Sequence, residues 1–332
     1  MNVTVLGAGG WGTALSILLH DNAAKTTLWA YKKEYAEELS RLRENRTYLH
    51  GVTIPDEIEI TADIEEAVDS ADVVAASIPS QYLREQLKKI ADFDFHKKLF
   101  VNTAKGIEAS TLLTMSEVVQ ATLKKCPIEN YVVLSGPSHA EEVSRRMPTA
   151  IVAASHHKKS AELVQKTFMN KYFRVYLNRD VKGVELCGAL KNVIALAAGM
   201  SDGAGYGDNT KAALMTRGMV EITRLGETLG AHHKTFSGLA GMGDLIVTCM
   251  SRYSRNRFVG EQVAAGRKLE EVLDEIKMVA EGVPTAKAAN QLAEKYGVEM
   301  PIMEQVYNVL FNGKDPQVAV RDLMMRPAKD EY

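Results

Sequence analysis

Seven short apolar runs divide the first 180 residues, with amphipathic stretches between them. They lie at 3–6, 26–31, 72–79, 98–104, 131–136, 149–155 and 173–177. Several are apolar at successive positions instead of alternate ones, which is typical of parallel strands that are buried on both faces of a sheet. The pattern predicts an α/β fold with a doubly wound, mostly parallel sheet of Rossmann type.

The pattern changes after about Val181, where apolar residues recur at helical spacing. Helices are predicted at 183–200, 211–229, 256–265, 284–296, 301–312 and 315–325. With 332 residues, the chain exceeds the size at which a single core stops growing. We therefore expect two domains, a sheet domain at 1–180 and an all-helical C-terminal domain at 181–332.

Composition excludes several classes of protein. The net charge of −2 gives no overall attraction to nucleic acid or to a membrane surface. No apolar run approaches the roughly 20 residues that a bilayer span needs, and the N-terminus does not resemble a signal peptide. Cys126, Cys187 and Cys249 are far apart and odd in number, so neither a disulfide framework nor a metal site is expected. A soluble, cytoplasmic protein is the prediction.

The motif GAGGWG (7–12) stands between the first apolar run and the helical stretch TALSILL. In this context Gly7 permits a tight turn, Gly9 lets the backbone approach a pyrophosphate, and Gly12 allows close packing of helix against strand. The free N–H groups of the helix N-terminus then face the phosphates. A dinucleotide site is predicted at residues 1–180, and a turn that merely needs glycine is the alternative.

The end of the second strand bears on cofactor choice. An NAD-specific site normally places Asp or Glu about 20 residues after the glycines, where it binds the ribose 2′-hydroxyl. This chain has Ala30, Tyr31, Lys32 and Lys33 there instead. Either lysine can pair with a 2′-phosphate, or both can belong to a solvated basic loop. The expected cofactor is NADP(H) or NAD(H), with NADP(H) at least accepted.

Lys191 is the sole charged residue between Leu186 and Ser201. Its surroundings are apolar on nearly all sides of the predicted helix, which predicts that the helix is buried. Burial is costly for an unpaired ammonium and lowers its pKa, which suits a general base at neutral pH. The alternatives are a lysine that extends to the surface and a lysine that meets a structural carboxylate.

Two further charges stand in uncharged surroundings. Asp244 is the only charged residue in the glycine-rich segment 235–251, where it can pair with Lys191, cap a following helix, or do both. Lys105 follows a predicted strand. Because ligands of open α/β sheets bind outside the carboxyl ends of the strands, a functional Lys105 is favoured over an ordinary surface lysine.

An anion site is predicted in SRYSRNRFVG (251–260), which places three arginines around Ser254 and Asn256. Arg255 offers a planar fork that suits a phosphate, and Ser254 and Asn256 can add donors. For Arg257 a solvated helix start is the alternative interpretation. The patch is too small for nucleic acid, which needs a basic face.

Together these residues predict a pocket between the domains. A dinucleotide would line one wall, two lysines and an aspartate would surround a hydroxyl or carbonyl group, and an arginine would bind an anion. This arrangement fits hydride transfer on a small phosphorylated or carboxylated alcohol. One alternative is a 3-hydroxyacid or 6-phosphogluconate-type dehydrogenase. Another is a sensor that binds the dinucleotide without chemistry.

The sequence resembles the bacterial type of NAD(P)-dependent glycerol-3-phosphate dehydrogenase over nearly its whole length. The resemblance is carried, in family order, by GAGGWGTALSILL, NTAKGIE, LSGPSHAEEV, ALKNVIALAAGMSDG, GLAGMGDLIVTC, SRNRFVG and AEGVPTAKA. It implies a reversible reaction between dihydroxyacetone phosphate plus NAD(P)H and sn-glycerol 3-phosphate. Reduction would supply the phospholipid backbone, and the protein would be a homodimer.

The resemblance also implies residue roles. Lys191 would accept the proton of the C2 hydroxyl in oxidation and return it in reduction, Lys105 would stabilise the alkoxide, and Asp244 would orient Lys191. Substrate contacts would come from these three residues and from Gly136, Ser138, Asn192, Thr248, Ser254, Arg255 and Asn256. Cofactor contacts would come from Gly7, Gly9, Gly10, Trp11, Gly12, Tyr31, Lys32, Lys105, Ala140, Arg255, Val279 and Glu281.

Overall fold

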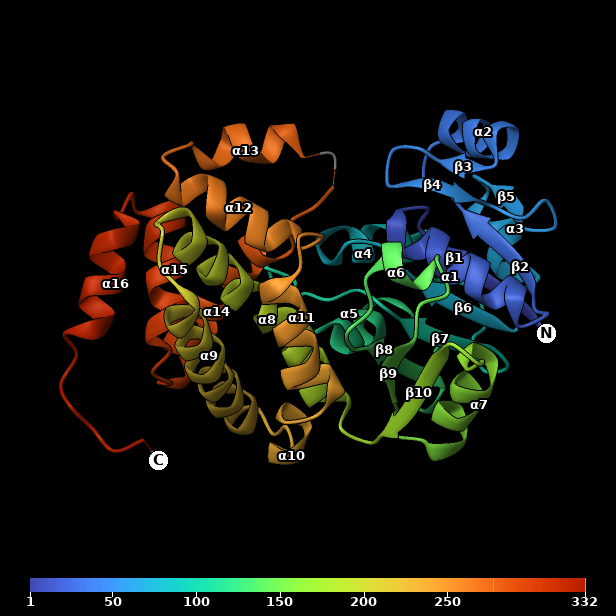
Figure 1. The fold of residues 1–332 in the computed structure, drawn as a ribbon. Helices are drawn as coiled ribbons and strands as arrows, with labels where there is room; N and C mark the ends of the chain where they lie inside the picture. The colour runs from blue at the N-terminus through green and yellow to red at the C-terminus, as the bar shows by residue number, and fades with distance from the viewer. Residues whose placement is uncertain (277, 332) are drawn as a thin grey trace.

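The computed structural model describes residues 1–276 and 278–331, and its first half is built on an eight-stranded sheet (Figure 1). The strand order is β10-β9-β8-β7-β6-β1-β2-β5. The bounds are β1 Asn2–Leu6, β2 Lys25–Trp29, β5 Glu59–Thr61, β6 Val73–Ala76, β7 Leu99–Asn102, β8 Tyr131–Ser135, β9 Thr149–Ala154 and β10 Phe173–Asn178. Among the described strands of this sheet, only β8 and β9 pair antiparallel, so the predicted, mostly parallel sheet is confirmed.

Both faces of the sheet are covered, which explains the continuous apolar runs. In β6, Val73 and Ala75 belong to one core cluster, whereas Val74 and Ala76 belong to another. The first cluster includes side chains of α1 (Gly10–Asp21), α2 (Lys33–Leu42) and α7 (Lys158–Phe168). The second includes side chains of α3 (Ile64–Asp69), α4 (Ser80–Lys88) and α5 (Met115–Thr122). A short hairpin of β3 (Glu44–Asn45) and β4 (Leu49–Thr53) lies outside the main sheet.

Among the described residues, every element after β10 is helical, as predicted. They are α8 Val181–Gly203, α9 Asp208–Thr228, α10 His233–Phe236, the π-helical turn η2 Leu239–Gly243, α11 Asp244–Met250, α12 Arg255–Ala264, α13 Leu269–Glu275, α14 Gly282–Tyr296, α15 Pro301–Phe311 and α16 Pro316–Met324. The six predicted helices correspond to α8, α9, α12, α14, α15 and α16. Their ends differ from the predicted ends by three residues or fewer.

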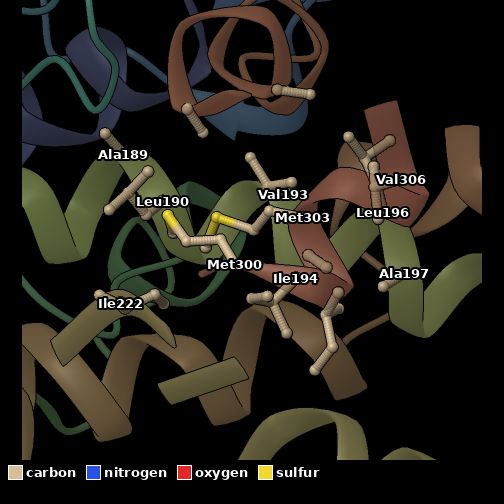
Figure 2. Close-up of a cluster of buried hydrophobic side chains, with 14 of the residues drawn as sticks. Ala189, Leu190, Val193, Ile194, Leu196, Ala197, Ile222, Met300, Met303 and Val306 are labelled. Carbon is tan, nitrogen blue, oxygen red and sulfur yellow. The ribbon is translucent and has the colours of Figure 1, made fainter. Parts of the chain in front are cut away.

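Helix α8 is the core element of the helical half. Its side chains pack with those of α9, α14 and α15, and Figure 2 shows Leu190, Val193 and Ile194 close to Ile222, Met300 and Met303. Contrary to the sequence-based expectation, this helix is long and apolar enough to cross a membrane. However, its apolar stretch is entirely buried within the protein, as in the core helix of a soluble fold.

Helices α8 and α12 cross with their backbones in close contact. A Cβ atom on Gly199 would overlap the carbonyl oxygen of Arg257, and one on Gly260 would overlap that of Leu196. A carbonyl oxygen cannot move aside as the end of a flexible side chain can. The two glycines therefore fix α12 relative to the C-terminal half of α8, about one to two helical turns after Lys191.

Candidate active site

Lys105, Lys191 and Asp244 form one cluster of charges. Lys105 lies in the loop after β7, Lys191 in the middle of α8, and Asp244 is the first residue of α11. Lys105 Nζ is 2.8 Å from Oδ2 of Asp244, and Lys191 Nζ is 3.1 Å from Oδ1. One carboxylate therefore binds two ammonium groups, one through each oxygen.

The structure excludes some of the open interpretations of these three residues. Lys191 is only 4% exposed, so it does not extend to the surface. Lys105 also donates to the carbonyl oxygen of Gly136, so it is not an ordinary surface lysine. The N-cap of α11 is Gly243, so the interpretation of Asp244 as the N-cap is wrong. The expected pairing of Asp244 with Lys191 is present.

Burial and charge set the protonation of this cluster. Burial lowers the pKa of Lys191 and Asp244 partly opposes this effect, which leaves the pKa at about 8. Burial raises the pKa of Asp244, but Lys105 and Lys191 outweigh it and hold this pKa below its usual value. Asp244 is thus ionised at neutral pH, and Lys191 gains or loses its proton near that pH.

Thr248 fixes the Lys191 ammonium from a second direction. Its hydroxyl donates to the carbonyl oxygen of Asp244 at 2.6 Å, one helical turn earlier in α11. Because the single hydroxyl proton is used there, Thr248 Oγ1 is an acceptor for Lys191 Nζ at 2.5 Å. The ammonium has three protons, so a third partner can bind it in addition to Asp244 and Thr248.

Two buried amides connect the cluster to α12 and α14. Asn256 donates to the side-chain oxygen of Asn192 and accepts from the backbone N–H of Gly282. Asn192 in turn donates to the carbonyl oxygens of Gly188 and Lys105. These bonds tie the starts of α12 and α14 to the loop of Lys105.

The glycine motif has the geometry that a dinucleotide needs. Gly7 has a φ of +112°, and a Cβ there would lie 2.8 Å from the carbonyl oxygen of Ser77. A Cβ on Gly12 would overlap the carbonyl oxygen of Gly7. A Cβ on Gly9, by contrast, would meet nothing within 4 Å, so open space lies beside the start of α1. This cradle fits the pyrophosphate of a nicotinamide dinucleotide.

The neighbours of the glycine motif come from three segments. A Cβ on Gly10 would lie 2.6 Å from the carbonyl oxygen of Tyr48 and 3.7 Å from the Cβ of Ala140, the first residue of α6 (Ala140–Val143). Trp11 is half-buried and packs against the same core cluster as Ala140. These residues line the side of α1 that faces β4 and α6.

Glu281 joins the helical half to the start of α4. It accepts from the backbone N–H and the hydroxyl of Ser80. Arg255 is exposed at the first position of α12 and donates to the carbonyl oxygen of Val279 at 2.8 Å, two residues before Glu281. The predicted cofactor contacts Arg255 and Val279 are thus bonded to each other, and Glu281 is bonded to α4.

The remaining predicted substrate residues lie at two turns. Ser138 donates to the carbonyl oxygen of Gly136 in the loop after β8. Ser254 is the N-cap of α12 and accepts from the N–H of Arg257. The side chain of Arg257 pairs with Asp202 at 2.6 Å, so it is neither an anion contact nor a solvated helix start.

Tyr31 and Lys32 lie apart from the charged cluster. Both are exposed at the end of β2, and Tyr31 lies beneath the ammonium of Lys89, which is 4.8 Å from its ring centre. Lys32 is the N-cap residue of α2. Within residues 1–276 and 278–331, neither has a hydrogen bond or ion pair to Lys105, Lys191 or Asp244.

His139 is one residue beside the cluster that sequence reasoning missed. Burial, and then the charges of Lys191 and Lys105, lower its pKa to about 4, so the ring is neutral. Its ring centre is 5.8 Å from that of Tyr253. The only signal in the sequence was its place between Ser138 and Ala140. The paired histidines at 156–157 and 232–233 are exposed, and no metal-binding cluster occurs among the described residues.

Comparison with known proteins agrees with this geometry. The N-terminal family of NAD-dependent glycerol-3-phosphate dehydrogenases matches residues 2–161, and the corresponding C-terminal family matches residues 180–321. The chain belongs to this family. It is an NAD(P)-dependent oxidoreductase, as the resemblance implied.

Individual relatives match the whole chain. A glycerol-3-phosphate dehydrogenase [NAD(P)+] of Chlorobium phaeobacteroides is 51% identical and covers 100% of this chain and 99% of its own. One from Thermoanaerobacter is 53% identical with the same coverage. The crystal structure of glycerol-3-phosphate dehydrogenase from Coxiella burnetii superposes with a TM-score of 0.93 at 34% identity. It covers 98% of this chain and 99% of its own.

Proposed function

We propose that this protein catalyses the reversible reduction of dihydroxyacetone phosphate by NAD(P)H to sn-glycerol 3-phosphate. The observation that carries the proposal is the buried carboxylate of Asp244 bound to both Lys191 and Lys105. This arrangement occurs in a chain that belongs to the glycerol-3-phosphate dehydrogenase family. It supplies the two groups that the interconversion of a carbonyl and a hydroxyl requires, a proton carrier and a fixed positive charge.

The bound nicotinamide would supply the hydride in reduction and receive it in oxidation. Gly7, Gly9, Gly10 and Gly12 would hold the pyrophosphate at the start of α1, supported by Trp11 and Ala140. At the other end of the site Arg255, Val279 and Glu281 would complete the cofactor contacts. We assign Tyr31 and Lys32 to the adenosine ribose, where Lys32 would meet a 2′-phosphate.

Lys191 would donate a proton to the C2 oxygen of dihydroxyacetone phosphate and take it back in the reverse reaction. With a pKa of about 8, it can do both near neutral pH. Asp244 and Thr248 occupy two of its three hydrogen-bonding directions, which leaves the third for the substrate. Asp244 acts through Lys191, because its own oxygens are both engaged by lysines.

Lys105 would stabilise the negative charge that develops on the C2 oxygen. Its ammonium bridges Asp244 and the carbonyl oxygen of Gly136, so it is fixed before substrate binds and costs little reorganisation. Gly136 and Ser138 would line the substrate on the sheet side, and Asn192 would line it on the α8 side.

The phosphate would bind at the start of α12. Arg255 is exposed there, and Ser254 can donate its hydroxyl proton while its oxygen caps the helix. The free N–H groups of the first helical turn add a positive end of the helix dipole. Asn256 is held by Asn192, which keeps the phosphate end and the catalytic end in register.

We extend the proposal to the biological setting. Reduction is the proposed physiological direction, with the product entering glycerophospholipid synthesis. A cytoplasmic homodimer with a dinucleotide-binding domain at 1–180 and a substrate domain at 181–332 is the proposed assembly. Sedimentation analysis of the purified protein measures the oligomeric state directly.

The activity is tested by following NADPH and then NADH oxidation by purified protein with dihydroxyacetone phosphate. We expect rapid turnover with at least one of the two cofactors. The ratio of the rates reports whether Lys32 selects the 2′-phosphate. Cofactor binding without turnover would favour the sensor interpretation, and turnover only with 3-hydroxyacids or phosphogluconate would favour a related dehydrogenase.

A further inference from the structure

The rings of His139 and Tyr253 are in contact between two loops that carry proposed substrate residues. Their centres are 5.8 Å apart and their planes are inclined by 58°. His139 belongs to the loop after β8, whereas Tyr253 belongs to the loop between α11 and α12. The contact therefore connects the sheet half to the helical half of the molecule.

Each ring is adjacent in sequence to residues that we assign to the substrate. His139 follows Ser138, and Tyr253 precedes Ser254. The two loops are also joined to the charged cluster, since Gly136 accepts from Lys105 and His139 faces the Val247 backbone of α11.

The imidazole makes one polar contact, a hydrogen bond with the backbone of Val247, and it also packs against the ring of Tyr253. Nε2 of His139 is buried and has no hydrogen-bond partner among the described residues. The ring carries no charge at neutral pH, because burial and the nearby lysines oppose protonation. The guanidinium of Arg252 is 5.2 Å from the ring centre of Tyr253, so both a cation and the imidazole contact this ring.

We propose that His139 and Tyr253 are positioning residues for the reduction of dihydroxyacetone phosphate, and that their ring contact holds the Ser138 loop against the Ser254 loop. The inference rests on the substrate site proposed above. Neither residue touches the reacting atoms. Their effect is to keep the two loops at the spacing that the phosphorylated substrate requires.

The test compares three variants of His139 in the purified full-length enzyme. His139→Ala removes the ring, His139→Phe keeps it without nitrogen, and His139→Gln places an amide near the position of Nε2. We expect His139→Ala to raise the KM for dihydroxyacetone phosphate about three- to tenfold, in keeping with the contribution of an aromatic pair. The KM for NADPH should change less than twofold. His139→Phe should restore the KM, and His139→Gln should not.

Tyr253 provides the reciprocal arm. Tyr253→Ala should raise the KM for dihydroxyacetone phosphate by a similar factor. The double variant of His139→Ala and Tyr253→Ala should have a KM no higher than that of the more impaired single variant, because both substitutions remove the same contact. Additive losses would overturn the pairing. A wild-type KM in His139→Ala would overturn the role itself. Recovery by His139→Gln but not by His139→Phe would assign the effect to nitrogen and contradict the proposal.

Two measurements separate this inference from other causes. A merely structural role would lower the melting temperature and change the KM values for both substrates together, and that result counts against the inference. Arg255→Ala, assayed in parallel, tests the substrate site alone. If Arg255→Ala raises the KM for dihydroxyacetone phosphate and His139→Ala does not, the proposed positioning role of the ring contact is wrong. If neither changes it, the site assignment is wrong.

Discussion

Lys191 and Asp244 form a salt bridge of 3.1 Å although they come from different helices and are 5% and 2% exposed in their side chains. A buried ion pair is stable only when its remaining hydrogen-bonding groups have partners. Lys105 provides a partner for Asp244 here, and Thr248 provides one for Lys191. Asp244 binds both lysines, and its charge raises the pKa of Lys191 against the effect of burial.

Replacement of Lys191 tests its role as proton carrier. Lys191→Ala should lower kcat by about 10²–10⁴-fold, the usual contribution of one acid–base group. Lys182→Ala on the same helix is the matched control, since Lys182 pairs with Glu117 and lies outside the proposed site. A folded Lys191→Ala enzyme with wild-type turnover would show that another group carries the proton.

The pH dependence should have opposite signs in the two directions. Reduction needs Lys191 protonated, so kcat/KM for dihydroxyacetone phosphate should be constant below a pKa of about 8 and fall above it. Oxidation of glycerol 3-phosphate needs the neutral amine, so its kcat/KM should rise with pH and level off above the same value. Initial rates from pH 6 to 10 (~0.5-unit steps) measure both profiles. Profiles of equal sign in both directions would contradict the assignment.

Neutralisation of Asp244 should move those profiles. The charge of Asp244 raises the pKa of Lys191 against burial and against Lys105. In Asp244→Asn the pKa of Lys191 should therefore fall, and the decline of the reduction rate should begin at a lower pH. Asp322→Asn, at an exposed carboxylate, provides the control and should leave the profile unchanged. An unshifted profile in Asp244→Asn would mean that the ion pair does not set the proton affinity.

Two alanine substitutions in the glycine motif should separate cofactor binding from folding. A Cβ on Gly9 meets nothing within 4 Å, so Gly9→Ala should keep the melting temperature but raise the KM for NADPH about tenfold or more, because its methyl group enters the phosphate space. A Cβ on Gly12 overlaps the backbone of Gly7, so Gly12→Ala should lower the melting temperature. Differential scanning fluorimetry and steady-state kinetics distinguish the two. Normal NADPH kinetics in Gly9→Ala would place the pyrophosphate elsewhere.

The sheet and the long helices could be predicted because each repeats one signal over many residues. Successive apolar positions revealed strands that have a core on both faces, and Lys191 was conspicuous against an apolar helix. By contrast, β5 has three residues and the hairpin of β3 and β4 is mostly polar, so neither carries a pattern. Helix α11 follows the glycine-rich turn η2, whose composition favours a loop over a helix.

The cluster could be predicted only in part. The isolation of Lys105, Lys191 and Asp244 among uncharged neighbours indicated three special charges. That one carboxylate binds both lysines depends on how β7, α8 and α11 converge, which no local pattern specifies. His139 was missed for a related reason. Its contact is with the ring of Tyr253, more than a hundred positions later in the sequence, and no local pattern around a single histidine in a loop indicates such a contact.

The crossing of α8 and α12 has a consequence for substrate length. Gly199 and Gly260 bring the two backbones together, so the span between the Lys191 ammonium and the first turn of α12 is set by main-chain contact. A molecule with an extra carbon between its phosphate and its reacting oxygen could not contact both the Lys191 ammonium and the first turn of α12. The crossing of α8 and α12 therefore sets the length of substrate that can reach both ends of the site. Adapting such an enzyme to longer substrates must begin at small residues that no ligand touches.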